Sequence, residues 1–127
     1  MIGAKKQSGG HSEIEYIAVT YVVLKDMVAD IVGAVHPEKI VLFGSRARGE
    51  SNRDSDVDLL IVVRDFEAAT RQQLLSKVRN GLFDYLVPID LVLYAQGELS
   101  RFSEWKNHVV RTALDEGRVL YERQSTS

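Results

Sequence analysis

The sequence predicts an α/β or α+β domain in which helices pack on a short mixed β-sheet. Three observations lead to this fold class. Apolar runs rich in β-branched residues, which are typical of buried strands, occur at 39–43, 57–63 and 89–94. Segments with apolar residues three and four positions apart, which are typical of amphipathic helices, alternate with these runs. The resulting order of helix, strand, strand, helix, strand and helix suits helices packed on one sheet.

The first element is predicted to be a long helix from about Glu13 to Val35, with Ser12 as its N-cap. Its first half is apolar nearly all round, so it needs cover on more than one side. We interpret it as a central core helix, or as a helix that also contacts another polypeptide. His36-Pro37 ends it, because the residue before a proline avoids the helical conformation. Its apolar stripe consists of Ile14, Ile17, Tyr21, Leu24, Val28 and Ile31.

The second helix is predicted over Glu67–Leu86 and is amphipathic. Val87-Pro88 ends it, since proline cannot continue a helix. The strand Ile89–Tyr94 follows directly, with one charged residue inside an otherwise apolar run. The apolar face of this helix consists of Leu74, Leu75, Val78, Leu82 and Leu86.

The C-terminal part is predicted to turn at Gln96–Glu98 and to form one last helix over about Ser103–Glu116. Gly117 follows that helix at the position where glycine commonly ends helices. Arg118–Tyr121 is expected to add a short edge strand.

Composition limits the class of protein. The 127 residues suit a single domain, predicted over 13–122, between a polar, Gly-rich tail at 1–12 and a frayed end at 123–127. The net charge of −2 argues against a nucleic-acid partner held by bulk electrostatics. Without cysteine, disulfides, zinc–thiolate sites and thiol nucleophiles are excluded. The apolar run at 16–24 is too short to span a membrane and resembles no signal peptide, so we expect a cytoplasmic protein.

Two carboxylates stand at the start of the second apolar run. Asp56 and Asp58 are two residues apart, so in a strand they point to the same face, with Cα atoms roughly 6.6 Å apart. At an effective dielectric constant of about 20 their charges repel by about 2.5 kcal/mol. A cation or a proton is needed to offset this repulsion. Because only oxygen ligands are present, a hard ion such as Mg²⁺ is favoured.

Asp90 is a third candidate ligand. It interrupts the apolar strand at 89–94, where a bare charge is costly to bury. It either lies at a sheet end, solvated or paired with an arginine, or its strand lies beside 57–63 and brings it to the same cation. The second interpretation explains two anomalies with one ion, and we favour it.

The connection after the first strand is predicted to be a phosphate-binding turn. Gly44 lets the backbone turn sharply and approach a ligand closely. Ser45 is suited to cap a short helical turn whose free N–H groups bind phosphate. Arg46 and Arg48 lie in the same turn, where they are interpreted either as phosphate ligands or as solvent-exposed loop charges.

Taken together, these motifs resemble the polymerase-beta-type nucleotidyltransferase superfamily. They comprise Gly44-Ser45, ten further residues, Asp56-Val57-Asp58 and then Asp90 in its apolar strand. The run 42–49 (Leu-Phe-Gly-Ser-Arg-Ala-Arg-Gly) and the ending 116–121 (Glu-Gly-Arg-Val-Leu-Tyr) are similar to its minimal prokaryotic branch, the MNT-type proteins. The resemblance implies a palm-like core in which Gly44 and Ser45 hold the triphosphate of ATP. It also implies that Asp56 and Asp58 bind two Mg²⁺ ions and that Asp90 completes the catalytic metal site.

The same resemblance implies an enzyme that transfers AMP, or another NMP, from ATP to a hydroxyl group. MNT-type relatives imply a HEPN-type toxin as the acceptor, which makes this chain the antitoxin of a toxin–antitoxin pair. Two alternatives stay open: a non-catalytic binding module that neutralises its partner by contact, and transfer to a small molecule. Polymerase activity is not expected, because no nucleic-acid-binding domain is recognisable. Whether the chain forms a homo-oligomer is left open.

Overall fold

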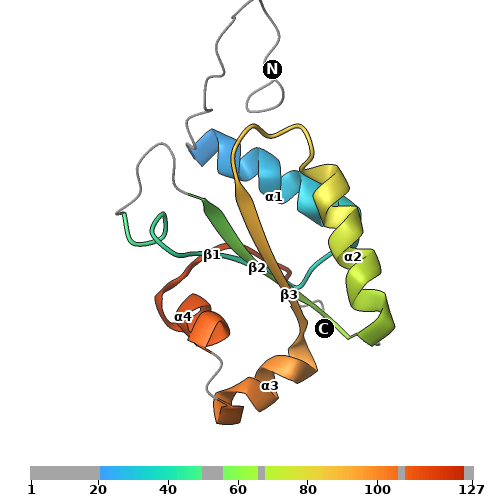
Figure 1. Ribbon diagram of the computed structural model, residues 1–127, viewed down its shortest axis with the longest axis vertical. Helices are drawn as coiled ribbons and strands as arrows, with labels where there is room; N and C mark the ends of the chain where they lie inside the picture. Colours follow the sequence, from blue (N-terminus) through green and yellow to red (C-terminus); the bar gives the residue numbers. More distant parts are fainter. Residues whose placement is uncertain (1–20, 50–55, 66–67, 106–107, 125–127) are drawn as a thin grey trace, which may run out of the picture.

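The computed structural model describes residues 21–49, 56–65, 68–105 and 108–124. Residues 1–20, which include the predicted tail and the first part of the predicted first helix, lie outside this description. Four strands form one sheet, and helices pack on it (Figure 1). The elements are α1 (Tyr21–Val35), β1 (Lys39–Phe43), β2 (Val57–Val63), α2 (Ala68–Gly81), β3 (Ile89–Ala95), α3 (Gln96–Trp105), α4 (His108–Glu116) and β4 (Arg118–Glu122).

The sheet has the strand order β3-β2-β1-β4 and is mixed, as predicted. β1 pairs antiparallel with both β2 and β4, whereas β2 and β3 run parallel. The parallel connection passes through α2, as parallel neighbours require a crossover. In the parallel register Asp58 lies beside Asp90. The fold class expected from the sequence is therefore confirmed.

Apolar side chains fill both faces of the sheet. Val57, Leu59 and Ile61 are buried in the larger core, which α1 and α2 cover. Leu60 belongs to a smaller cluster on the other face, together with Ala113 of α4. Since successive residues of a strand point to opposite faces, even-numbered residues of β2 point away from α1. This alternation places Asp58, the second residue of β2, on the face of the sheet opposite α1.

The end of α1 is confirmed at Val35, and His36 follows in the left-handed conformation with a φ of 49°. The predicted stripe of this helix is partly wrong. Tyr21 is 75% exposed, whereas Val23 and Met27, which lie outside the predicted stripe, are buried. In a segment that is apolar nearly all round, periodicity cannot select the buried face, and the neighbouring elements decide it.

The second helix is shorter than predicted. α2 ends at Gly81 instead of Leu86, and Leu86 is 40% exposed. After Gly81, Tyr85 is buried and donates a hydrogen bond from its hydroxyl to Asp30 Oδ2 of α1, at 2.7 Å. This tertiary contact outweighs the apolar spacing that predicted a longer helix, and glycine weakens the helix at the same place.

The predicted turn at Gln96–Glu98 is wrong, because α3 begins at Gln96. The carboxylate of Glu98 accepts a hydrogen bond from the Ala95 backbone N–H at 3.0 Å and also pairs with Arg71 of α2. A glutamate three residues into a helix that reaches back to the N-cap is half of a capping box. Ala95 replaces the usual Ser or Thr, so the sequence carries no recognisable cap signal. Two helices, α3 and α4, replace the single last helix that was predicted.

The predicted edge strand is confirmed and runs one residue further, as β4 (Arg118–Glu122). Arg123 follows it and donates its backbone N–H to the Glu38 carbonyl at 2.8 Å, which continues the pairing beside β1. Within the part of the chain that the structure describes, no helix has the length and apolar character needed to cross a membrane.

Candidate functional site

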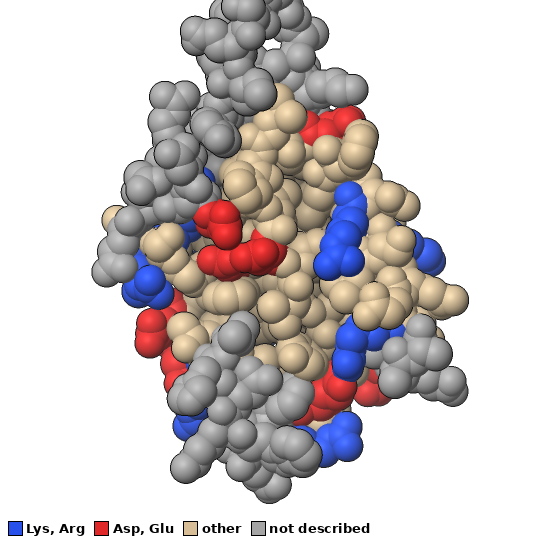
Figure 2. Space-filling view, viewed as in Figure 1, with Lys and Arg blue, Asp and Glu red and all other residues tan. Residues whose placement is uncertain are grey.

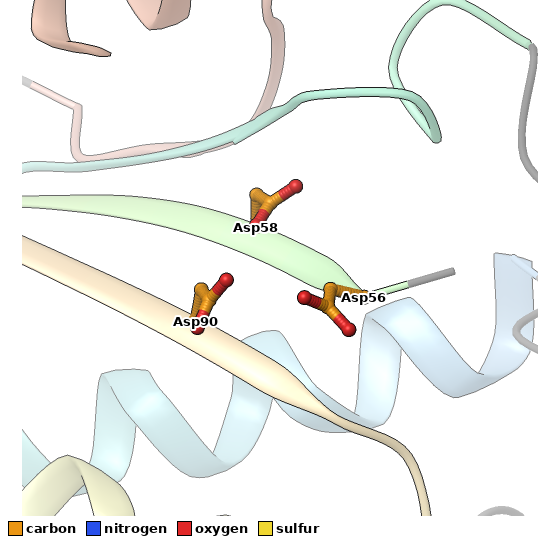
Figure 3. Close-up of side chains that lie close together, drawn as sticks. All are labelled: Asp56, Asp58 and Asp90. Carbon is orange, nitrogen blue, oxygen red and sulfur yellow. The ribbon is translucent and has the colours of Figure 1, made fainter. Parts of the chain in front are cut away.

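Three carboxylates meet where β2 and β3 begin (Figure 3). Asp56 directly precedes β2, Asp58 is its second residue, and Asp90 is the second residue of β3. One carboxylate oxygen of each lies within 4.8 Å of the others. A hard cation binds oxygen ligands at about 2.1–2.5 Å, so small side-chain movements would let one ion contact all three. The structure thus brings together the residues that the sequence proposed as ligands.

The sheet register is the cause of this convergence. Asp58 lies beside Asp90 in the parallel ladder, so both side chains leave the sheet on the same face. The Val57 N–H donates to the Pro88 carbonyl at 2.9 Å, which holds the starts of the two strands together. Figure 3 shows the three side chains gathered on one side of the two strands, with α1 passing behind them.

The carboxylates of the cluster repel one another. The pKa of Asp58 is raised from 3.8 to about 6, and burial of its carboxyl group is the largest cause. A hydrogen bond to Asp90 and the charges of Asp90 and Asp56 contribute to this rise, whereas the positive charge of Arg46 opposes it. These causes agree with the repulsion expected from the sequence. A proton or a cation shared by the cluster relieves it.

The cluster is open to solvent. Asp56 and Asp90 are exposed, and Asp58 is half-buried. In the space-filling view, one compact patch of acidic side chains lies near the beginning of β2 (Figure 2). A small charged ligand can therefore reach the carboxylates without any rearrangement of the sheet.

The predicted turn after β1 is a single helical turn. The backbone N–H groups of Ala47 and Arg48 donate to the Gly44 carbonyl at 3.1 and 3.3 Å, and Gly49 N–H donates to the Arg46 carbonyl at 3.3 Å. Gly44 has a φ of 76°, a conformation that favours glycine.

The group that Gly44 approaches closely is the side chain of Asp58. A Cβ at this position would lie 3.1 Å from Cγ of Asp58 and nearer still to one of its carboxylate oxygens. The sequence predicted a close approach of this glycine to a ligand. The structure shows in addition that Gly44 leaves room for the Asp58 carboxylate.

The two arginines of the turn differ. Arg46 Nε donates to the backbone carbonyl of Asp56 at 3.2 Å, which ties the turn to the residue before β2. Arg48 is exposed. The contact of Arg46 joins residues ten positions apart across a loop, so no local sequence signal could have revealed it.

A separate apolar groove of about 550 Å³ lies between α1 and β4. In the sheet order β1 lies between β4, which lines the groove, and the strands β2 and β3, at whose beginnings the carboxylates lie. Its principal apolar lining residues are Leu24, Val28, Val32, Leu120 and Tyr121.

Comparison with known proteins gives concordant findings at the level of the sequence. A family model described as "Nucleotidyltransferase domain" matches residues 23–120. A protein of Methanocaldococcus jannaschii, provisionally named a protein adenylyltransferase, is 39% identical over 85 residues, which cover 66% of this chain and 78% of that protein. The match to the family model includes the elements that carry the carboxylates and the Gly44 turn, since these lie between β1 and β3.

Two solved structures share the fold. One is a provisionally named nucleotidyltransferase from Sulfolobus solfataricus, with a TM-score of 0.54, 20% sequence identity, and coverage of 81% of this chain and 80% of that one. The other is a toxin-antitoxin with AMP-PNP, with a TM-score of 0.53, 20% identity, and coverage of 79% and 73%. At this level of identity the likeness concerns the fold.

Proposed function

The chain belongs to the nucleotidyltransferase domain family, and from that premise we propose that it transfers AMP from ATP to a hydroxyl group of a protein in a Mg²⁺-dependent reaction. The observation that carries this proposal is the convergence of Asp56, Asp58 and Asp90 beside the turn that begins at Gly44. Oxygen ligands at this spacing suit a hard cation, and the turn offers backbone N–H groups for phosphate.

The donor set fits magnesium. Asp56, Asp58 and Asp90 supply only carboxylate oxygens, and their mutual repulsion requires positive charge. In the proposal Asp56 and Asp58 hold two Mg²⁺ ions and Asp90 completes the set. Magnesium, when bound, neutralises charge on the triphosphate and on the leaving pyrophosphate.

The chain's own groups then bind and orient the reactants. Gly44 and Ser45 are proposed to hold the triphosphate, with Arg48 adding a charge-assisted contact. In the transfer step the acceptor oxygen attacks the α-phosphorus, the bond from that phosphorus to the pyrophosphate oxygen breaks, and pyrophosphate leaves. Asp90 is proposed to accept the proton of the attacking hydroxyl.

A protein acceptor is supported by the provisional name of the Methanocaldococcus jannaschii relative, which is 39% identical over 85 residues. We extend the proposal to a HEPN-type toxin as that acceptor, which the resemblance of the motifs implies. The toxin-antitoxin structure with AMP-PNP shares the fold of this chain, and a nucleotide and a toxin partner are compatible with that architecture. On this proposal the chain acts as an antitoxin by adenylylating its partner.

The test is co-expression with the partner protein, followed by mass spectrometry of the partner. Wild-type protein should add one or more AMP groups, and the Asp56→Ala/Asp58→Ala variant should add none. Omission of Mg²⁺ in the purified reaction should also abolish transfer. An unmodified partner in the presence of folded wild-type protein and ATP–Mg²⁺ would overturn the proposal.

The apolar groove favours a second candidate function, neutralisation of the partner by contact alone. The groove is lined by α1 and β4 and lies apart from the carboxylates, so a partner polypeptide can occupy it without engaging them. Ala29 is an exposed residue that lines the groove, and Ala29→Arg would place a positive charge there. Contact neutralisation predicts that Ala29→Arg fails to neutralise while Asp58→Asn succeeds, and adenylylation predicts that Asp58→Asn fails.

A further inference from the structure

We infer that Arg46 acts as a positioning residue, which orients the carboxylate cluster through the backbone of Asp56. The inference adds a residue to the proposed function. Its kcat and KM measurements therefore rest on that function. The Nε–H of Arg46 donates to the carbonyl oxygen of Asp56 at 3.2 Å. This role differs from the phosphate contact that the composition of the turn alone suggests.

Asp56 needs an anchor because it lies beyond the paired part of the sheet. The last pair between β1 and β2 joins Phe43 to Asp58, and the first pair between β2 and β3 joins Val57 to Ile89. Asp56 precedes both pairs and is exposed. The peptide group between Asp56 and Val57 is therefore held by contacts from outside the ladder: the Val57 N–H donates to the Pro88 carbonyl on one side, and Arg46 donates to the Asp56 carbonyl on the other. Fixing both sides of this group limits the directions that the Asp56 side chain can take.

Arg46 is itself held in place. Its carbonyl accepts the N–H of Gly49, and the turn around it is closed by the bonds of Ala47 and Arg48 to the Gly44 carbonyl. Arg46 is half-buried, which limits the freedom of its side chain. The arginine that bonds to Asp56 therefore belongs to a turn that backbone hydrogen bonds hold in shape.

The same turn contacts two of the three aspartates. Gly44 packs against the Asp58 side chain, and Arg46 bonds to the peptide group of Asp56. Asp90 is placed separately, by the parallel register of β3 with β2. The turn and the sheet register thus both constrain the three ligands. Loss of the Arg46 contact loosens Asp56, whose peptide group then keeps only the bond from Val57 N–H to the Pro88 carbonyl.

Preorganisation of ligands acts on metal affinity and on the rate of the chemical step. Displacement of a reacting group by about 1 Å costs on the order of 100-fold in rate, and loss of a contact that orients a metal ligand costs about 10–100-fold in affinity or activity. A positioning role therefore predicts a loss of kcat and of metal affinity, with a smaller change in the KM for ATP.

Two neutral substitutions separate the hydrogen bond from the charge. In Arg46→Gln the amide nitrogen occupies the bond position of the arginine Nε and keeps an N–H donor there. In Arg46→Met a methyl group occupies that position and donates nothing. Both variants lose the guanidinium charge and have similar reach, so they differ chiefly in the donor to Asp56.

We expect Arg46→Met to bind Mn²⁺ about 10-fold more weakly by calorimetry, and to lose kcat by about 10–100-fold with a KM for ATP within about threefold of wild type. Arg46→Gln should retain Mn²⁺ affinity within about threefold and recover most of kcat. Equal losses in both variants, with a raised KM for ATP, would overturn the positioning role in favour of a direct phosphate contact.

Melting temperatures in EDTA verify that both variants are folded. If Arg46→Met does not fold, Arg46→Gln alone decides, because the inference requires it to keep its Mn²⁺ affinity. Mn²⁺ binding needs no acceptor. A wild-type protein that binds Mn²⁺ and shows the Gln–Met difference but transfers no AMP would overturn the proposed function and leave the inference standing.

Discussion

The backbone of Gly44 lies directly against the carboxylate of Asp58, in a space that has no room for a side chain. A Cβ at Gly44 would lie 3.1 Å from Cγ of Asp58 and closer still to one of its oxygens. The turn proposed to hold phosphate and the carboxylates proposed to hold metal are therefore one packed unit, and disturbance of either is transmitted to the other.

Gly44→Ala should abolish metal binding and transfer. The new methyl group forces the Asp58 carboxylate away from its position, and the φ of 76° adds about 1–2 kcal/mol of strain for any residue with a Cβ. Calorimetry with Mn²⁺ and a transfer assay with α-labelled ATP measure the two losses.

Gly49→Ala is the matched control. Gly49 has a φ of 75°, nearly that of Gly44, but a Cβ there meets no atom within 4 Å among the described residues. It should lose similar stability and retain Mn²⁺ affinity. Equal Mn²⁺ affinities of the two variants would mean that backbone strain, and not contact with Asp58, explains the need for glycine.

Asp58→Asn should abolish transfer and stabilise the metal-free protein at pH 8. The amide keeps the shape of the carboxyl group and removes one charge from a repelling cluster in which Asp58 is half-buried. Relief on the order of 1 kcal/mol corresponds to an increase in Tm of about 3–6 °C. A sharp fall in Tm in EDTA would instead identify Asp58 as part of a stabilising ion pair.

The stability of the metal-free protein should depend on pH through Asp58. Its pKa is raised to about 6 in the folded state, so the folded state holds the proton more tightly than the unfolded chain does. The contribution of Asp58 to the free energy of unfolding is therefore present below about pH 4 and is lost as the pH rises through about 6.

Urea unfolding of wild type and Asp58→Asn in EDTA, at several pH values between 4 and 8, measures this contribution. The free energy of unfolding of the wild type minus that of the variant should fall over that range. Mg²⁺ affinity should rise over the same range, because the ion needs the ionised carboxylate. A difference that is constant with pH would contradict the raised pKa of Asp58.

Gly117→Ala should destabilise the fold by about 1–3 kcal/mol, as overpacking does. A Cβ at Gly117, between α4 and β4, would lie 2.5 Å from Cγ1 of Val41 and 2.9 Å from the Leu42 carbonyl. In the described part of the chain, a Cβ at Gly33 on α1 meets no atom within 4 Å, so Gly33→Ala should stabilise by about 0.5–1 kcal/mol, since alanine favours the helix. Thermal unfolding of both variants checks the opposite signs.

Tyr85→Phe should destabilise the protein by about 1.5–3 kcal/mol, because it removes a hydrogen bond to the carboxylate of Asp30 in a buried setting. Tyr21→Phe, at a side chain that is 75% exposed, should change the free energy of unfolding little. Chemical denaturation compares them. A loss in Tyr85→Phe no greater than in Tyr21→Phe would show that the hydrogen bond to Asp30 contributes nothing to stability.

Local patterns predicted the strands well. β1 and β2 have the bounds expected from their apolar runs, and β3 extends one residue beyond its predicted end. A short buried strand is apolar on both faces and is bounded by turn residues, so its limits are visible in the sequence. Where an end depends on a distant contact, as at Gly81 before the Tyr85–Asp30 hydrogen bond, local patterns failed.

The sequence by itself determined which side chains could bind a cation and phosphate. The alternation of a strand places Asp56 and Asp58 on one face, and an isolated charge in an apolar run identifies Asp90. Only the tertiary structure decided that these carboxylates meet, because the meeting depends on parallel pairing between strands separated by α2. The contacts of Gly44 with Asp58 and of Arg46 with Asp56 were likewise decided by the fold, since they join residues that only sheet pairing brings together.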